Sequence, residues 1–214
     1  MKGVLFGDKH SYYEWGLILQ KKEIEAPEPK INQIELEGRD GVLDLSDFFG
    51  EVKYKNRSLS FQFAKKEIVQ DGFLALFSVV QNALHGKVMN VILDDDPSYY
   101  YRGRVTINEW KSEKNLGQIV IEVDAEPYKY KVQETVAVVE LVNESMEVYL
   151  PNGRKKVVPT IDITGNINLT FGANYYSLSE GRYILPAVRL EEGENVITVN
   201  GTGTATFTYR EGGL

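Results

Sequence analysis

Few residues of this 214-residue chain could carry out acid-base or nucleophilic chemistry. There is no cysteine, which excludes disulfides, thiolate zinc sites, iron–sulfur clusters and cysteine nucleophiles. A serine hydrolase needs a histidine held between a carboxylate and a nucleophile, and the histidines are His10 and His85. His10 lies beside Ser11 in an expected loop, His85 ends an expected helix, and no Gly-x-Ser-x-Gly sequence occurs. We therefore expect no catalytic residue. A glycan-cleaving carboxylate pair is the weakest alternative, because nothing marks two of the 31 acidic residues.

Two other segments resemble ligand sites but favour turns. Asp94, Asp95 and Asp96 are consecutive and precede Pro97. Consecutive side chains of an extended segment point to opposite faces, so this pattern indicates a turn rather than a calcium or magnesium site. Residues 201–204, Gly-Thr-Gly-Thr, lead into a strand and not a helix, which predicts a turn instead of a phosphate-binding loop. We expect neither a metal nor a cofactor.

Composition and charge predict a folded, mildly acidic chain. Apolar residues make up 43% of the sequence, charged residues make up 26%, and the formal net charge is −7. Lys and Arg form no stripe, so specific binding of nucleic acid is not expected. The amino terminus lacks the apolar segment of a signal peptide, and no apolar run is long enough to cross a membrane. We expect assembly in a cytoplasm without membrane insertion.

Apolar residues alternate with a period of two through most of the sequence, which predicts a mainly β protein. The alternation is clearest at 59–63, 119–125 and 205–209. A helix is predicted at about 71–85, with Asp71 as its amino-terminal cap and Gly86 after its end. Its apolar residues with helical spacing are Phe73, Leu76, Phe77, Val80 and Leu84.

The chain is expected to form two domains, 1–132 and 133–214. A hairpin connection is predicted at 112–116, and the following strand should stop at Glu126-Pro127. From Glu134 onward no helical period appears, and short apolar segments alternate with turn signals. This spacing indicates a second, all-β sandwich or jelly roll. The turns are expected at 151–153, 164–166, 180–181 and 192–194.

Residues 21–30, KKEIEAPEPK, fit neither period and carry two prolines. We expect them to be extended and outside any core, either as a surface loop or as an arm that lies on a neighbouring subunit. The residues that would make this intersubunit contact are Ile24, Pro27 and Pro29.

Several sequence segments, in this order, resemble the amino-terminal domain of the distal tail proteins, often called Dit, of long non-contractile-tailed bacteriophages. The last segment, at 190–214, is similar to the closing strands of that family's carboxy-terminal domain. These motifs are structural rather than catalytic. The other segments are SYYEWGL (11–17), GRDGVLDL (38–45), YKNRSLSFQF (54–63), LHGKVMNVILDDDPSYYYRGRV (84–105) and EPYKY (126–130).

The resemblance implies a tail-tube-like β barrel or sandwich with one flanking helix, followed by a galectin-like or carbohydrate-binding-module-like β-sandwich. It further implies a homohexameric ring at the virion tail tip, assembled in the bacterial host cytoplasm. Such a ring joins the tail tube protein to the tail-associated lysin or fibre protein and often carries receptor-binding proteins. DNA would pass through its lumen without specific binding, which the acidic charge favours.

Two arginines and three tyrosines in these segments have candidate binding roles. Gly38 and Gly41 should form a tight turn around Arg39. Arg39 and Arg57 are candidate ion-pair partners within the subunit or across the ring, because guanidinium pairs bidentately with carboxylates. An alternative function is a carbohydrate-binding adhesion module that contacts the host cell wall. Its candidate stacking residues are Tyr175, Tyr176 and Tyr183.

Overall fold

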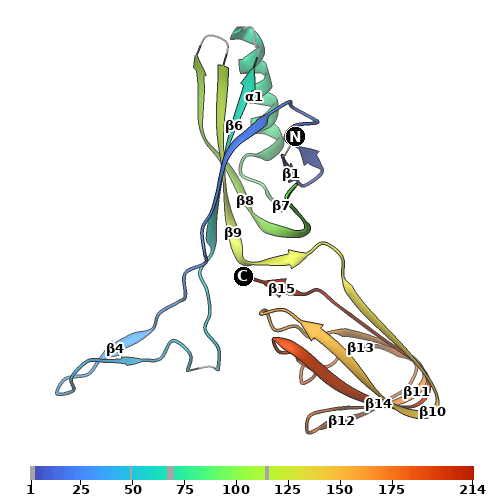
Figure 1. The fold of residues 1–214 in the computed structure, drawn as a ribbon. Helices are drawn as coiled ribbons and strands as arrows, with labels where there is room; N and C mark the ends of the chain where they lie inside the picture. The colour runs from blue at the N-terminus through green and yellow to red at the C-terminus, as the bar shows by residue number, and fades with distance from the viewer. Residues whose placement is uncertain (1–2, 49, 67–69, 114–115) are drawn as a thin grey trace. The chain divides into compact units, whose positions relative to one another are not determined.

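The computed structural model describes residues 3–48, 50–66, 70–113 and 116–214 (Figure 1). The protein is mainly β with one helix in the described residues, as the sequence predicts. The chain divides into two compact units, Met1–Lys129 (the N-terminal unit) and Tyr130–Leu214 (the C-terminal unit). The boundary expected after residue 132 lies close to this division, and independent folding of the two domains stays a prediction. No helical segment among the described residues combines the length and the apolar character needed to cross a membrane.

The N-terminal unit is built on one antiparallel sheet in the order β2-β1-β7-β8-β9-β6-β3. The period-two alternation explains its core, because facing residues of β6 and β9 are buried on the same side. Phe61 pairs with Ile121 and Phe63 with Ile119, and none of these four side chains is exposed. The strands are β1 (Val4–Phe6), β2 (Lys9–His10), β3 (Ile18–Ile24), β6 (Arg57–Lys66), β7 (Val88–Leu93), β8 (Asp96–Glu113) and β9 (Leu116–Lys131).

The helix α1 (Gln70–Leu84) confirms the helix predicted at 71–85 and lies along the sheet (Figure 1). The rings of Phe73 and Phe77 lie 5.3 and 5.0 Å from the ring of Trp110 in β8. Lys87 donates hydrogen bonds of 2.9 Å to the carbonyls of Asn82 and Ala83, which places a cation at the negative end of the helix. The predicted capping side chain of Asp71 lies outside the described residues.

The predicted end of the last strand of this unit is wrong, because β9 continues through Pro127 to Lys131. The ladder between β6 and β9 ends at the pair Arg57–Ala125. Pro127 lies beyond this pair, so its missing N–H removes no bond to β6. The hairpin connection predicted at 112–116 includes residues that lie outside the described ones.

The C-terminal unit is formed by one five-stranded sheet in the order β10-β14-β11-β12, with β13 also paired to β11. β15 (Gly212–Gly213) pairs with β9, whose last residues Tyr130 and Lys131 belong to this unit. The all-β character is confirmed, while a galectin-like assignment stays a prediction. The strands of the sheet are β10 (Thr135–Asn152), β11 (Thr160–Phe171), β12 (Asn174–Leu178), β13 (Gly181–Ile184) and β14 (Gly193–Tyr209).

A line of irregular residues crosses the three long strands of this sheet. Gly203 of β14 pairs with Gly165 of β11 on one side and with Leu141 of β10 on the other. Next to it, β10 has a bulge at Asn143, whose φ is 52°. Bulges and glycines bend strands sharply, so one sheet can curl around a closed core that includes Leu141 and Phe207. The turns predicted at 164–166 and 201–204 are therefore wrong, because both segments lie inside strands.

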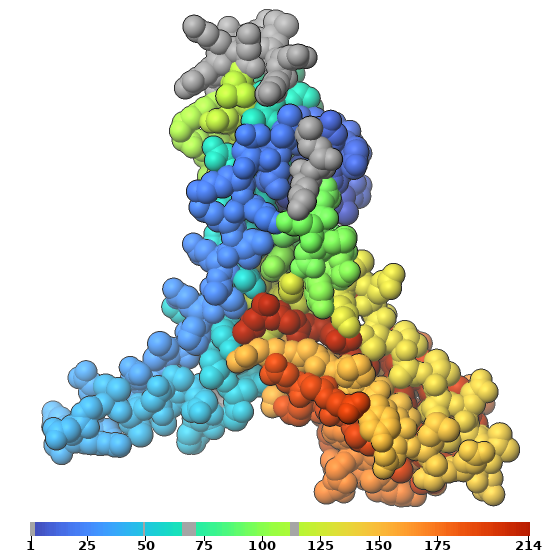
Figure 2. Space-filling model, in the orientation of Figure 1, coloured from blue at the N-terminus to red at the C-terminus, as the bar shows by residue number. Residues whose placement is uncertain are grey.

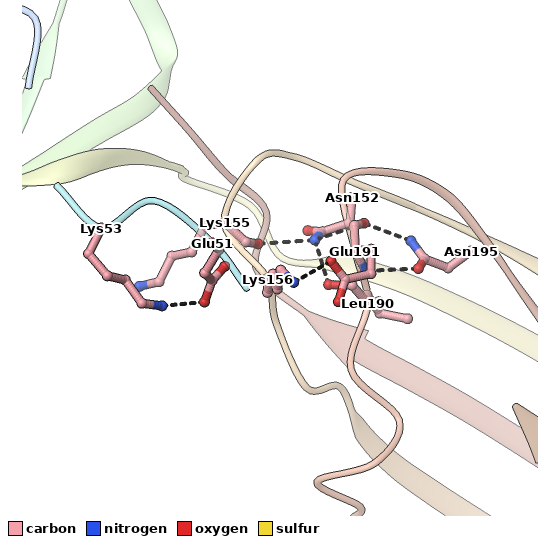
Figure 3. A network of polar contacts seen from close by, with 8 residues as sticks. All are labelled: Glu51, Lys53, Asn152, Lys155, Lys156, Leu190, Glu191 and Asn195. Atoms are coloured by element: carbon pink, nitrogen blue, oxygen red, sulfur yellow. Dashed lines mark hydrogen bonds and ion pairs between the residues drawn. The ribbon is translucent and has the colours of Figure 1, made fainter. Parts of the chain in front are cut away.

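Two asparagines connect the loops at one end of the C-terminal unit (Figure 3). Asn152 Nδ2 lies 3.0 Å from the carbonyl oxygen of Lys155 and 3.2 Å from that of Leu190. Asn195 Oδ1 accepts a 2.8 Å bond from the N–H of Glu191, whose side chain forms a 2.7 Å ion pair with Lys156. Both amides are buried, so these bonds fix loops that contain little regular structure.

The buried Tyr209 predicts a loss of stability at high pH. Burial, and secondarily the charge of Glu211, raise the pKa of Tyr209 from 10.0 to about 12, and its hydroxyl donates a 2.6 Å bond to the Pro151 carbonyl. The unfolded chain therefore releases this proton first. The contribution is fully present below pH 10 and is lost as the pH rises through about 12. Urea unfolding at increasing pH should show a flatter alkaline decline in Tyr209→Phe than in the unmodified chain.

Equal slopes for Tyr209→Phe and the unmodified chain would show that Tyr209 does not contribute to the alkaline loss.

Candidate assembly site

His10, Ser11 and Asp94 lie together in the N-terminal unit, although 84 residues separate His10 from Asp94. His10 Nε2 lies 3.1 Å from Asp94 Oδ1, and Asp94 Oδ2 accepts a 2.6 Å bond from the N–H of Gly3. His10 Nδ1 accepts bonds from the N–H groups of Tyr12 and Tyr13 at 3.1 and 3.2 Å. These bonds place the imidazole proton on Nε2.

This arrangement is not a hydrolase triad. In a triad the carboxylate holds one imidazole nitrogen and the nucleophile uses the other. Here both nitrogens of His10 are engaged, by a carboxylate and by backbone N–H groups. The Ser11 hydroxyl is fully buried and accepts a 3.0 Å bond from the N–H of Val4. His10 therefore connects β2 to the turn after β7, and Ser11 connects the segment after β2 to β1.

The other sequence candidates for chemistry are also parts of the backbone framework. His85 Nδ1 accepts a 3.1 Å bond from the N–H of Ile107. Asp94 and Asp95 form the turn between β7 and β8, as predicted, and Asp96 begins β8. Among the described residues, no three His, Asp or Glu side chains gather in a way that could hold a metal ion.

The N-terminal unit extends a long arm, residues 25–56, between β3 and β6 (Figures 1 and 2). At its root, Lys30 N donates to Lys53 O at 2.7 Å and Lys55 N donates to Glu28 O at 2.8 Å. The ring of Tyr54 makes an edge-on contact of 6.0 Å with the ring of Tyr128 in β9. These bonds make the root a two-stranded ribbon attached to the sheet.

The outer part of the arm is a hairpin of β4 (Gln33–Glu35) and β5 (Val42–Asp44). Gly38 and Gly41 have φ values of 82° and 76° and lie in the connection between the two strands, as predicted, but this connection spans residues 36–41 and is longer than a tight turn. Ile34 pairs directly with Leu43, and Leu36 and Leu45 lie two residues along, so the four share a face. None of the four belongs to a core cluster formed by the described residues, and Ile34 remains 48% exposed.

This hairpin is acidic as well as apolar. Between Ile31 and Phe48 the only basic residue is Arg39. The Ser46 hydroxyl and N–H, with the Gln33 amide, hold the pKa of Asp44 below its usual value, so this carboxylate stays charged. A two-stranded hairpin is only marginally stable alone, and an uncovered apolar face marks an interaction surface. The acidic residues of the hairpin are Glu35, Glu37, Asp40, Asp44 and Asp47.

The five candidate interface residues fall in different environments. Ile24 lies in β3, paired with Leu59, and packs against the core, so the expectation that all of 21–30 lies outside the core is wrong. Pro27 is buried. Pro29 is exposed and forms an isolated β-bridge with Tyr54. Arg39 is exposed in the connection between β4 and β5.

Arg57 has the most confined environment of these residues. It is 8% exposed, donates a 2.8 Å bond to the carbonyl of Glu25, and stacks 5.4 Å from the ring of Tyr101. Within the described residues it forms no ion pair with a carboxylate. Arg57 therefore has little exposed surface with which to contact a neighbouring subunit.

The three tyrosines considered for carbohydrate binding do not lie on one exposed surface. Tyr175 is 63% exposed, whereas Tyr176 and Tyr183 pack against the core of the C-terminal unit. The Tyr183 hydroxyl donates a 3.0 Å bond to the carbonyl of Ser179. Carbohydrate binding at these residues stays a prediction.

Protein-family models give no match to this sequence, and no curated protein matches it. Among solved structures, the fold is similar to the crystal structure of the Dit protein of SPP1, described as a paradigm of the hub adsorption apparatus in phages that infect Gram-positive bacteria. The TM-score is 0.70 at 12% sequence identity, and the match covers 98% of this chain and 99% of that chain.

This comparison confirms, for the fold, the resemblance to distal tail proteins that the sequence indicates. It extends over nearly the whole chain, including the C-terminal unit. At this level of identity the comparison establishes the fold alone.

Proposed function

We propose that this chain is a structural hub protein of a phage or prophage tail tip, without catalytic activity. Copies of it form a homohexameric ring that joins the tail tube protein to the tail-associated lysin or fibre protein, with receptor-binding proteins attached. The ring assembles in the bacterial host cytoplasm, and DNA passes through its lumen without specific binding. The full-length likeness to a hub protein supports this proposal.

The observation that carries the proposal is the uncovered apolar face of the β4–β5 hairpin. Closed rings need head-to-tail contacts, in which each copy offers one surface and accepts a different one. The hairpin is a surface that a copy can offer, because Ile34, Leu36, Leu43 and Leu45 belong to neither core cluster of the described residues. Burying large apolar side chains contributes roughly 1.5 to 3 kcal/mol each.

The hairpin supplies a matched pair of variants to test self-assembly. Ile34 and Leu43 face each other on the apolar face, and Gln33 and Asp44 face each other on the opposite face. The double variant Ile34→Ser/Leu43→Ser should lose ring formation, because it removes the apolar contact. Native mass spectrometry and sedimentation of the full chain would measure the oligomer.

The double variant Gln33→Ser/Val42→Ser is the control and should still form rings, because both residues lie on the opposite face and every hairpin carboxylate is kept. Both variants should keep the melting temperature of the unmodified subunit, since the hairpin belongs to neither core. Rings of equal stability in both variants would contradict a role for this face in assembly.

A further inference from the structure

The outward surface of α1 has an unusual composition for an exposed helix. Exposed helix faces in globular proteins usually carry charged residues. From Gly72 to Leu84 this helix has none. Leu74 and Val79 are 50% and 56% exposed. The uncharged face also includes exposed small or polar residues with helical spacing, namely Ala75, Ser78 and Asn82.

Basic side chains lie at the carboxyl end of the same helix. Lys87 donates to the carbonyls of the last helical turn, and Arg104 donates to the carbonyl of Gly86. Arg104 pairs in register with Val88, which is 49% exposed. Two basic side chains therefore lie at the carboxyl end of this uncharged helix.

Charge distinguishes this surface from two other exposed surfaces of the described residues. The uncovered face of the N-terminal sheet carries charges of both signs, including Glu122, Glu23 and the ion-pair partner of Glu23, Lys21. The exposed apolar strand β10 carries Glu140, Glu144 and Glu147, which would repel the acidic hairpin, since like charges in contact cost free energy. The α1 surface lacks acidic residues from Gly72 to Leu84 and ends in two cations.

We propose that the apolar face of the β4–β5 hairpin of one copy packs on the uncharged face of α1 of the next copy, with the hairpin carboxylates near Lys87 and Arg104. This rests on the proposed function, because it names the surface that receives the arm in a ring. Each copy then presents its acidic, apolar hairpin face to one neighbour and receives the hairpin of its other neighbour on the neutral to basic α1 face. Two different surfaces of this kind satisfy the geometry of a head-to-tail contact.

The sign of a charge placed at Val79 tests this docking. Val79→Glu brings a negative charge to the acidic hairpin, whereas Val79→Lys brings a positive charge of similar size. Val79→Glu should weaken ring formation at least about 10-fold relative to Val79→Lys, since about 1.4 kcal/mol corresponds to that factor. Sedimentation of the full chain over a concentration series, with melting temperatures as the folding control, would measure the difference.

Val138, in β10, is 60% exposed and provides the control position. Val138→Glu and Val138→Lys should assemble alike. Val79→Glu and Val79→Lys rings of equal stability would overturn the docking while leaving the proposed ring intact.

The absence of native cysteine allows a second measurement. Chains with Leu36→Cys and differently tagged chains with Val79→Cys should form a mixed disulfide on oxidation, in preference to a pairing of Leu36→Cys with Tyr13→Cys. Preference for Tyr13 would overturn the docking. An unmodified chain that stays monomeric at every concentration, with or without other tail proteins, would overturn both the docking and the proposed function.

Discussion

Gly203→Ala should unfold the C-terminal unit and leave the N-terminal unit folded. A methyl group at this position would overlap the carbonyl oxygen of Thr164 in the neighbouring strand. The backbone φ of 138° is also one that L side chains rarely adopt. Backbone of a paired strand cannot move away without breaking the ladder, so the expected cost exceeds about 4 kcal/mol. Urea unfolding monitored by amide resonances of both units would measure it.

Gly172→Ala is the matched control for this substitution. Its φ is also positive, at 56°, but a methyl group there meets no atom within 4 Å. It should therefore lose only about 1 to 2 kcal/mol from backbone strain. Similar losses of stability for Gly172→Ala and Gly203→Ala would show that the neighbouring Thr164 carbonyl does not exclude a side chain at position 203.

Phe61→Ala should destabilise the N-terminal unit by roughly 3 to 5 kcal/mol. The side chain of Phe61 is fully buried, and its ring lies 5.9 Å from that of Phe6 and 6.4 Å from that of Phe63. Removing the ring leaves a cavity between two aromatic neighbours that the sheet holds in place. The midpoint of urea unfolding of this unit would report the loss.

Tyr13→Ala gives the comparison for an aromatic ring that is not in the core. Tyr13 is 77% exposed, so its removal should change stability by less than about 0.5 kcal/mol. Tyr54→Ala should fall between these limits, because Tyr54 is half-buried and contacts Tyr128. A Phe61→Ala variant as stable as Tyr13→Ala would mean that the core rearranges to fill the cavity.

The helix and the strands of the N-terminal core could be predicted because their signals are local. The spacing of Phe73, Val80 and Leu84 defines one helical face, and all three are buried. The alternation through Phe61 and Phe63 likewise defines a strand with one buried face. Local periodicity was sufficient wherever one element buries one face.

The bend of the C-terminal sheet could not be predicted in this way. Gly165, Gly201 and Gly203 have the composition of turns, and only cross-strand pairing shows that they meet inside a sheet. The contact of His10 with Asp94 is hidden for the same reason, since the two residues are 84 positions apart. Neither pairing can be detected from the spacing of residues along a single sequence.

The sequence predicts only part of the arm. The prolines favour an extended segment at 21–30, whereas the arm runs from residue 25 to residue 56, and its hairpin is predicted only as a turn. The alternation of Ile34 and Leu36, repeated by Leu43 and Leu45 across that turn, is the amphipathic pattern of a paired ribbon.

The bend at Gly203 also determines how the C-terminal unit can lose its structure. β10, β11 and β14 run without interruption through the bend, so each contributes residues to both sides of the closed core. We therefore expect the amide protons on both sides of the bend to exchange together, because opening one side withdraws strands from the other.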